Sequence, residues 1–290
     1  MLLLALLGVV PAACSAPSYG VPVAQEVETA PSQAFAVGVR KLSWQRTPAR
    51  PLPTIVWYPA VGPVGADPVT DAPPASGRFP VVLLSHGLGG QPEGFIDVAK
   101  ALAAAGFVVA APAYPYTKKH SPAFDRNDVR NQPADAEFVL GEVIKMEFAS
   151  PRRCAAGFSA GGFTTSGLFT PDRNPQLRCG IVISAGAMDG GFSGAPAPIL
   201  FIHGDADKTV AYSRGRSAFA DLAWPKAFVT MHGQGHGEFL DAKRPGFPPA
   251  MATMLDFLRW NLYGDTAARD RLAADGTSRG LASIQLSLGS

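Results

Sequence analysis

The sequence predicts an α/β fold in which one mostly parallel sheet of eight strands carries helices on both faces, without a large cap domain. Two strand-like segments come first with no helix between them, and short apolar runs then alternate with helical segments along the rest of the chain. Hydrophobic residues make up 47% of the 290 residues and charged residues 17%, so the chain has enough apolar side chains to bury the core of such a sheet and its helices.

The eight predicted strands are an early pair followed by six buried runs. The segments QAFAVGVRKLSW and LPTIVWYPA form the pair, and we expect them to make a hairpin. A run such as FPVVLLSH is apolar throughout and bounded by turn residues, which is typical of a parallel strand buried on both faces. The predicted strands are residues 33–44, 52–60, 79–86, 107–114, 153–159, 179–186, 198–204 and 226–233.

Five helices are predicted between and after these runs. PEGFIDVAKALAAAG ends on a glycine that can cap a helix, and ADAEFVLGEVIKMEF is long and amphipathic. The predicted helices are residues 92–106, 134–148, 160–169, 209–222 and 249–264. Only about a dozen residues separate CGIVIS from PILFI, which leaves no room for a cap domain at that point.

The first 16 residues are predicted to be a secretory signal peptide. The apolar stretch Leu2–Val10 has the length of a signal h-region, small residues follow it, and it is too short to span a bilayer as a helix. No Lys or Arg precedes Arg40, so the usual positive n-region is missing. Cys14 follows two alanines, so a lipoprotein signal, with a lipidated Cys14 as membrane anchor, stays open beside ordinary cleavage. Either way we expect an exported protein: periplasmic, secreted or anchored at the cell envelope.

The remaining chain is predicted to hold one large domain. Residues 17–32 are rich in Pro, Ser and Ala and are expected to be a linker. The α/β domain is assigned to residues 33–264, and the polar residues 265–290 are assigned to a peripheral tail, in which RDRLAAD could add a turn of helix.

Charge and cysteine content narrow the function classes. The formal net charge is +2 and no run of Lys and Arg occurs, which argues against a nucleic-acid partner. Cys154 and Cys179 open the runs RRCAAGFS and LRCGIVIS. If these are neighbouring parallel strands, the cysteines occupy equivalent positions, and an oxidising compartment favours a disulfide between them. Two buried thiols are the alternative.

The stretch GFSAGG, residues 157–162, contains a candidate nucleophile, Ser159. It falls between a predicted buried strand and a predicted helix, where a G-x-S-x-G turn would expose the serine at a helix N-terminus. The alternative is a serine in an ordinary tight turn. A serine hydroxyl needs a base, an orienting acid and oxyanion donors before it can act as a nucleophile.

The sequence supplies an acid and a base in the order serine, acid, histidine. Asp207 follows the strand PILFI, and His236 follows the strand KAFVTM, so both are expected at the carboxyl ends of parallel strands. Asp205 is the rival acid, although it could instead bond the turn backbone, and His232 is the rival base. Glycines around the two histidines argue against a helix and therefore against a metal site there.

Two backbone donors and several aromatic side chains complete the predicted site. The N–H groups of Ala160, after the nucleophile, and Leu88, in the glycine-rich loop SHGLGG, are the predicted oxyanion hole. Phe158, Tyr114 and Phe239 are predicted to contact substrate, with ordinary core packing as the alternative. Further aromatic residues assigned to the rim are Phe163, Tyr116 and Phe192.

Taken together, SHGLGG, LAAAGFVVAAPAY, GFSAGG, HGDADKTV and GHGEFL resemble the motifs of an α/β-hydrolase. They are similar to the branch of platelet-activating factor acetylhydrolases and dienelactone hydrolases, which includes relatives of polyester-degrading cutinases. The resemblance covers about residues 33–263. It implies Ser159 as nucleophile, His236 as base, Asp207 as acid, and Leu88 and Ala160 as oxyanion donors. GFSAGG differs from the GHS and GWS forms common in that branch, and dienelactone hydrolases proper carry a cysteine nucleophile.

The resulting expectation is a monomeric serine hydrolase, without cofactor or metal, that cleaves carboxylic esters through an acyl-enzyme. Its expected substrates are short-acyl or exposed esters in small molecules, lipids or polymers. A peptidase or amidase with the same triad and a non-catalytic exported binding protein are the alternatives.

Overall fold

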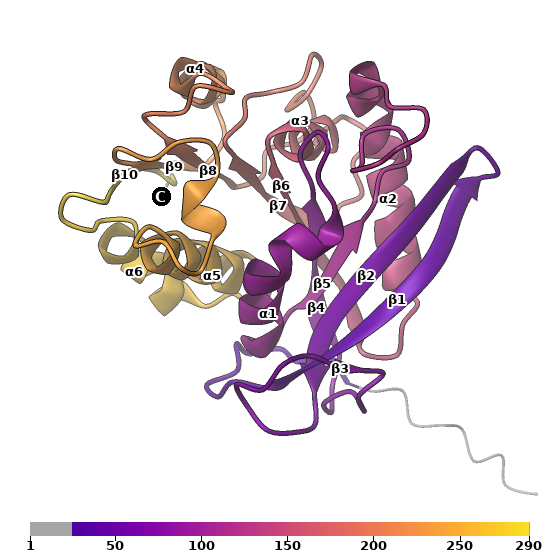
Figure 1. The fold of residues 1–290 in the computed structure, drawn as a ribbon. Coiled ribbons are helices and arrows are strands. Elements are labelled where there is room, and N and C mark those ends of the chain that lie inside the picture. The colour runs from indigo at the N-terminus through magenta and orange to yellow at the C-terminus, as the bar shows by residue number, and fades with distance from the viewer. Residues whose placement is uncertain (1–24, 290) are drawn as a thin grey trace, which may run out of the picture.

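The computed structural model describes residues 25–289, which form an α/β structure around one mixed sheet (Figure 1). The sheet has ten strands in the order β10-β9-β8-β7-β6-β4-β5-β2-β1-β3. The strands are β1 (Ala36–Thr47), β2 (Arg50–Ala60), β3 (Val69–Thr70), β4 (Phe79–Ser85), β5 (Val108–Pro112), β6 (Ala149–Phe158), β7 (Leu177–Ile183), β8 (Ile199–Gly204), β9 (Lys226–Met231) and β10 (Ala282–Ser287).

The centre of the sheet is parallel and its edges are largely antiparallel. Strands β5, β4, β6, β7, β8 and β9 are neighbours that pair in parallel. Strand β2 pairs antiparallel with both β1 and β5, as the predicted early hairpin requires. Every residue of β4 is buried, because helices cover both faces of the sheet at that point.

The prediction of eight strands is wrong by two. Strand β3 is a two-residue exposed segment inside the loop at 61–77, and it is too short to give an alternating pattern. Strand β10 has the sequence ASIQLS, in which Ser283, Gln285, Leu286 and Ser287 are exposed, so it lacks a regular apolar alternation, and it lies at the sheet edge beside β9. The sheet is therefore mixed, whereas the sequence predicts a mostly parallel one.

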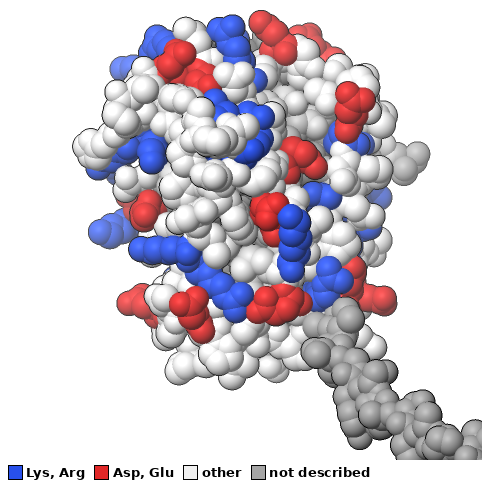
Figure 2. Space-filling model, turned by 90° about the vertical axis from the view of Figure 1, so that its right-hand side faces the viewer, with Lys and Arg blue, Asp and Glu red and all other residues white. Residues whose placement is uncertain are grey.

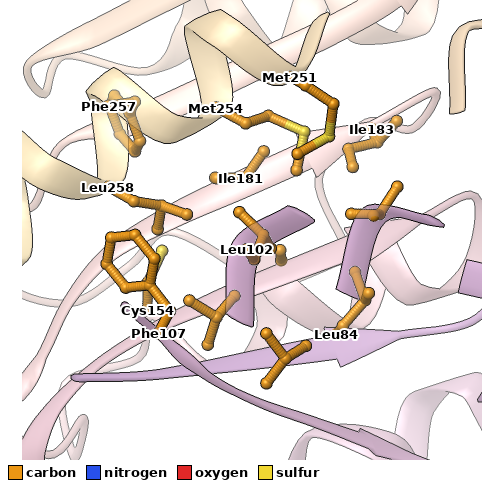
Figure 3. Close-up of a cluster of buried hydrophobic side chains, with 14 of the residues drawn as sticks. Leu84, Leu102, Phe107, Cys154, Ile181, Ile183, Met251, Met254, Phe257 and Leu258 are labelled. Atoms are coloured by element: carbon orange, nitrogen blue, oxygen red, sulfur yellow. The ribbon is translucent and has the colours of Figure 1, made fainter. Parts of the chain in front are cut away.

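Helices cover the two faces in two groups of three. Helices α1 (Ile96–Ala104), α5 (Phe247–Tyr263) and α6 (Thr266–Asp275) pack on one face, where Leu84, Leu102, Ile181 and Met254 belong to one cluster of buried side chains (Figure 3). On the other face, α2 (Gln132–Val143), α3 (Ala160–Gly167) and α4 (Tyr212–Asp221) adjoin a second cluster that includes Val139, Phe169 and Phe219. Burial of these two clusters is the main force that holds the helices to the sheet.

Within residues 25–289, no additional domain covers the carboxyl ends of the central strands. Residues 184–198, which connect β7 to β8, contain neither helix nor strand. The loops after β4, β6, β8 and β9 therefore meet at one edge of the sheet, near α3 and α4 at the top of Figure 1.

Residues 265–290 are not the peripheral tail that their polar sequence suggests. Helix α6 buries Leu272 in the cluster that holds α5, and β10 extends the sheet by pairing with β9. The described part of the predicted linker is also attached, since the Val27 N–H donates to the Arg78 carbonyl (3.0 Å). The predicted signal peptide, including Cys14, and the start of the linker lie outside the described residues.

Cys154 and Cys179 are direct partners in the parallel ladder of β6 and β7, but both are free thiols. The predicted disulfide is therefore absent. Both side chains are fully buried. Burial is the main cause that raises the pKa of Cys154 well above its usual value, and the neighbouring thiol of Cys179 contributes less.

The surface shows mixed charge, and the helices are not of the membrane-spanning kind within residues 25–289. Lys and Arg side chains intersperse with Asp and Glu on the face that carries β1 and β2, without forming a continuous basic stripe there (Figure 2). Within residues 25–289, none of the helices combines the length and the apolar character needed to cross a bilayer.

Candidate active site

Ser159 occupies a strained turn between β6 and α3. Its backbone angles are φ 54° and ψ −118°, a region that non-glycine residues rarely adopt. The Ser159 N–H donates to the Ile183 carbonyl (2.9 Å), and the Ser159 carbonyl accepts from the Gly162 N–H (2.8 Å), so both sides of the turn are fixed. The strained angles place the side chain at the carboxyl edge of the sheet, at the N-terminus of α3.

The glycines of GFSAGG are required by close backbone approach. A Cβ at Gly157 would overlap the carbonyl of Gly161, and a Cβ at Gly161 would overlap the carbonyl of Ser85 on β4. Both obstacles are backbone atoms, which cannot rotate away. A side chain at either position would therefore force the backbone of the turn to shift.

Asp207 and His236 are brought together from the loops after β8 and β9. The Asp207 Oδ2 atom lies 2.7 Å from His236 Nδ1, so the ring nitrogen donates its proton to the carboxylate. The other oxygen, Oδ1, accepts from the backbone N–H groups of Thr209 (2.8 Å) and Val210 (3.0 Å). Burial alone would raise the pKa of Asp207, but the hydrogen bonds from His236, Val210 and Thr209 bring it below its usual value. Asp207 is therefore an ionised carboxylate that leaves Nε2 of His236 free to accept a proton.

The sequence interpretation missed His203, the last residue but one of β8. Its Nε2–H donates to the Val210 carbonyl (3.0 Å), and Nε2 lies 3.2 Å from Asp207 Oδ2. The side chain is 1% exposed, and burial lowers the pKa of His203, which keeps the ring neutral. Its place four residues before Asp207, at the end of a buried strand, was the available signal.

The rival acid and base pair with each other. Asp205 Oδ2 lies 3.0 Å from His232 Nδ1, while Asp205 Oδ1 accepts from the Gly233 N–H (2.6 Å). His232 Nε2 lies 2.9 Å from the hydroxyl of Ser283 on β10. Because both ring nitrogens of His232 are engaged away from Asp207, the rival pair holds the C-terminal strand instead of forming part of the Ser159 site.

The loop after β4 passes directly over Ser159. A Cβ at Gly87 would lie 3.1 Å from the Ser159 Cβ, so Leu88, the next residue, is adjacent to the serine. Among the residues that the structure describes, the Leu88 N–H donates no hydrogen bond. Ala160 is the first residue of α3, so its N–H has no acceptor within the helix. Both predicted oxyanion donors are thus placed around the serine with their N–H groups available.

His86 fixes the shape of this loop. Its Nε2 accepts the backbone N–H of Tyr114 (3.1 Å), so Nδ1 carries the proton and donates to the Gly87 carbonyl (2.7 Å). Burial lowers the pKa of His86 to about 4, so the ring is neutral at ordinary pH.

A cavity of about 410 Å³, called cavity A here, opens beside His236. Its walls include the loop from Gly87 to Gln91, Phe95, Phe158 and Leu240, and its rim carries Asp97 and Asp241. Phe158 lies 4.6 Å from the ring of His236, centroid to centroid. Gly237, with φ 76°, leaves room for that ring, since a Cβ there would overlap Phe158. Phe158 is therefore the predicted aromatic residue that does line the cavity.

Tyr114 and Phe239 do not contact this cavity, so their predicted substrate contacts are wrong. Both are fully buried. The Tyr114 hydroxyl bonds Ser85 Oγ (2.7 Å), and Phe239 belongs to the core cluster under α5. Aromatic side chains near a sheet edge fill the core as readily as a pocket, and sequence position does not separate the two cases.

None of the three further aromatic residues predicted at the rim lines cavity A. The Tyr116 hydroxyl donates to the Ala49 carbonyl (2.9 Å), which attaches it to the β1–β2 turn. Phe192 packs against Phe169, with ring centroids 5.9 Å apart. Phe163, on the first turn of α3, is half-buried beside a separate cavity described below.

Within residues 25–289, the site lacks a hydrogen bond between Ser159 and His236, and it lacks a cluster of metal-binding side chains. The hydrogen bonds of this part of the chain do not include one between Ser159 and His236, although hydroxyl–imidazole contacts of this kind are often long before substrate binds. In the same residues, no three His, Cys, Asp or Glu side chains are grouped as a metal site. The chain matches no protein-family model and no curated protein, so the geometry alone carries the functional argument.

Proposed function

We propose that this chain is a serine hydrolase of carboxylic esters with an α/β-hydrolase fold. The observation that carries the proposal is the strained Ser159 between β6 and α3, at the same sheet edge as the Asp207–His236 pair. The parallel centre, the antiparallel early strands and the chain order serine, acid, histidine support the fold assignment.

The proposed reaction has two steps. Ser159 Oγ attacks the ester carbonyl while His236 Nε2 takes its proton, and Asp207 stabilises the imidazolium through Nδ1. His236 then gives the proton to the leaving alcohol, and an acyl-enzyme forms on Ser159. In the second step His236 activates water, which hydrolyses the acyl-enzyme and restores the serine.

The backbone N–H groups of Leu88 and Ala160 stabilise the negative charge that develops on the carbonyl oxygen. Loss of one such donor costs roughly 10²–10³ in rate in enzymes of this type. His86 acts through Leu88, because its bond to the Gly87 carbonyl sets the course of the loop.

The size and exposure of the site indicate the substrate class. Cavity A, at about 410 Å³, accommodates a small organic group, and the short β7–β8 connection leaves the site open. Short-acyl esters and esters displayed on a larger body, such as a lipid or a polymer, fit this arrangement. The proposal also includes export of the protein by the N-terminal segment, which the mass of the mature N-terminus would test.

The first test is hydrolysis of p-nitrophenyl esters from acetate to palmitate by the wild type and by Ser159→Ala. We expect turnover of the short esters by the wild type and its loss in the variant. Ser32→Ala, at an exposed serine far from the site in the sequence, is the matched control and should retain full activity. A folded wild type that turns over none of the esters would contradict the proposal and would favour amides or a binding role.

A further inference from the structure

A second cavity, called cavity B here, lies on the other face of the sheet from cavity A. It has a volume of about 660 Å³, and its walls include Phe163, Met188, Arg130 and Arg214. Phe163 packs against the cluster under α2 and α4, whereas Phe158 and Leu240 of cavity A pack against the cluster under α1 and α5. The two cavities therefore open toward opposite faces at the same edge.

Ser159 lies between these cavities. Phe163 follows it by four residues, and the Phe163 N–H donates to the Ser159 carbonyl (3.3 Å), so Phe163 lies on the first turn of α3, directly after the strained serine. On the other side, Gly87 and Phe158 bring the wall of cavity A against the serine. An ester bound at Ser159 can place its acyl part in one cavity and its alcohol part in the other; these parts are called the acyl limb and the alcohol limb.

The two cavities carry opposite charge. Cavity B has two arginines and one carboxylate, Asp189, while the charged side chains of cavity A are Asp97 and Asp241. Within residues 25–289 neither Arg130 nor Arg214 forms a salt bridge. Arg130 Nε donates to the Asn127 carbonyl (3.0 Å), which holds the side chain in place.

Arg214 is held by an aromatic ring. Its guanidinium lies 5.4 Å from the centroid of the Phe163 ring, and its backbone packs closely against Gly186 after β7. The planar donor groups of Arg130 and Arg214 match the two oxygens of a carboxylate better than the ammonium group of a lysine would.

The role of His236 indicates which part of the ester, acyl or alcohol, lies in which cavity. His236 has to protonate the leaving alcohol, and His236 lines cavity A. The alcohol limb therefore points into cavity A, and the acyl limb extends past α3 toward cavity B.

We propose that cavity B is the acyl subsite and that it selects acyl groups ending in a carboxylate, so that monoesters of dicarboxylic acids are the preferred substrates. This inference rests on the proposed ester hydrolase activity. The carboxylate at the far end of the acyl chain binds Arg130 and Arg214, while the acidic rim of cavity A repels the same group and prevents the reversed orientation.

The test compares mono-p-nitrophenyl adipate with p-nitrophenyl hexanoate, which has the same acyl length without the carboxylate. Arg130 and Arg214 are both exposed, so we expect Arg130→Gln with Arg214→Gln to lower kcat/KM for the adipate ester roughly threefold to tenfold, the range for two exposed ion pairs together. The hexanoate value should change less than twofold. Arg126→Gln, an exposed arginine on the same short helix η2 (Arg126–Asn131) but outside the cavity, is the matched control.

Two further measurements make the result specific. Asp189→Asn should raise the adipate-to-hexanoate ratio, because it removes the carboxylate of cavity B. High salt should lower the wild-type ratio, because the attraction between exposed charges is screened.

An adipate-to-hexanoate ratio that is the same in the wild type and the double variant would overturn the inference, as would an equal fall in Arg126→Gln. If Ser159-dependent hydrolysis of hexanoate is retained in that case, the proposed function stands and only the assignment of cavity B fails. If the wild type hydrolyses neither ester, both proposals fail together.

Discussion

Replacement of Asp207 by asparagine tests how the carboxylate controls His236. Asp207 accepts three hydrogen bonds, one at Oδ2 from His236 and two at Oδ1 from Thr209 and Val210. His203 Nε2 lies 3.2 Å from Oδ2. Asparagine has a single acceptor oxygen. If that oxygen serves the two backbone N–H groups, the amide NH₂ faces the histidines and can only donate.

The consequence is a change of tautomer at His236. With a donor opposite Nδ1, the neutral ring keeps its proton on Nε2 and can no longer accept the proton of Ser159. The same substitution in a serine protease lowers kcat by about 10⁴, and we expect a fall of about 10³–10⁴ here. That fall corresponds to about 4–5 kcal/mol of lost transition-state stabilisation. The unfolding free energy should fall by a smaller amount, about 1–3 kcal/mol, because the hydrogen bond between the buried Asp207 carboxylate and His236 is lost.

The assay is kcat for p-nitrophenyl butyrate, with circular dichroism and urea unfolding to verify the fold. Asp205→Asn is the matched control, since Asp205 holds His232 in the same way but at an exposed position. We expect that variant to retain activity within about twofold. Full activity in folded Asp207→Asn, or a large loss in Asp205→Asn, would refute the assignment of the acid.

Other predictions concern stability and titration. Gly161→Ala should lower the urea-unfolding free energy by about 1–3 kcal/mol or more through overlap with β4, whereas Gly141→Ala in α2 meets open space and should raise it by up to about 1 kcal/mol. Cys154 and Cys179 should both titrate with a thiol reagent in unreduced, urea-unfolded protein and stay unreactive when folded; a disulfide would leave them silent in both. Because burial lowers the folded pKa of His86 to about 4, stability should fall between pH 6.5 and 4, and a pH dependence unchanged in His86→Asn would count against this.

The order and spacing of the motifs were sufficient to predict the candidate site, because its parts are local. GFSAGG predicts a strand–turn–helix unit from its own glycines, and the structure has that unit with Ser159 in the strained position. Asp207 and His236 each follow a buried apolar run, and parallel neighbouring strands bring such positions together.

The features that sequence reasoning missed depend on tertiary contacts. Strand β10 is stabilised by pairing with β9 and by the contact between His232 and Ser283, and its sequence alone is not strand-like enough to show this. Tyr114 packs in the core cluster with its hydroxyl bonded to Ser85, a partner 29 residues away in the sequence. Cys154 and Cys179 are aligned as expected in the β6–β7 ladder, yet both are free thiols, because strand register brings two cysteines together without deciding whether they are oxidised.

The most direct test of the central claim, that Ser159 is an activated nucleophile, is covalent labelling with a fluorophosphonate followed by mass spectrometry of the intact protein and its peptides. The account predicts one adduct per chain, located on the peptide that contains Ser159 and absent from Ser159→Ala. His236→Ala should label far more slowly, because the serine then lacks its base. A folded wild type that takes up no label, or a label that persists in Ser159→Ala, would contradict the claim.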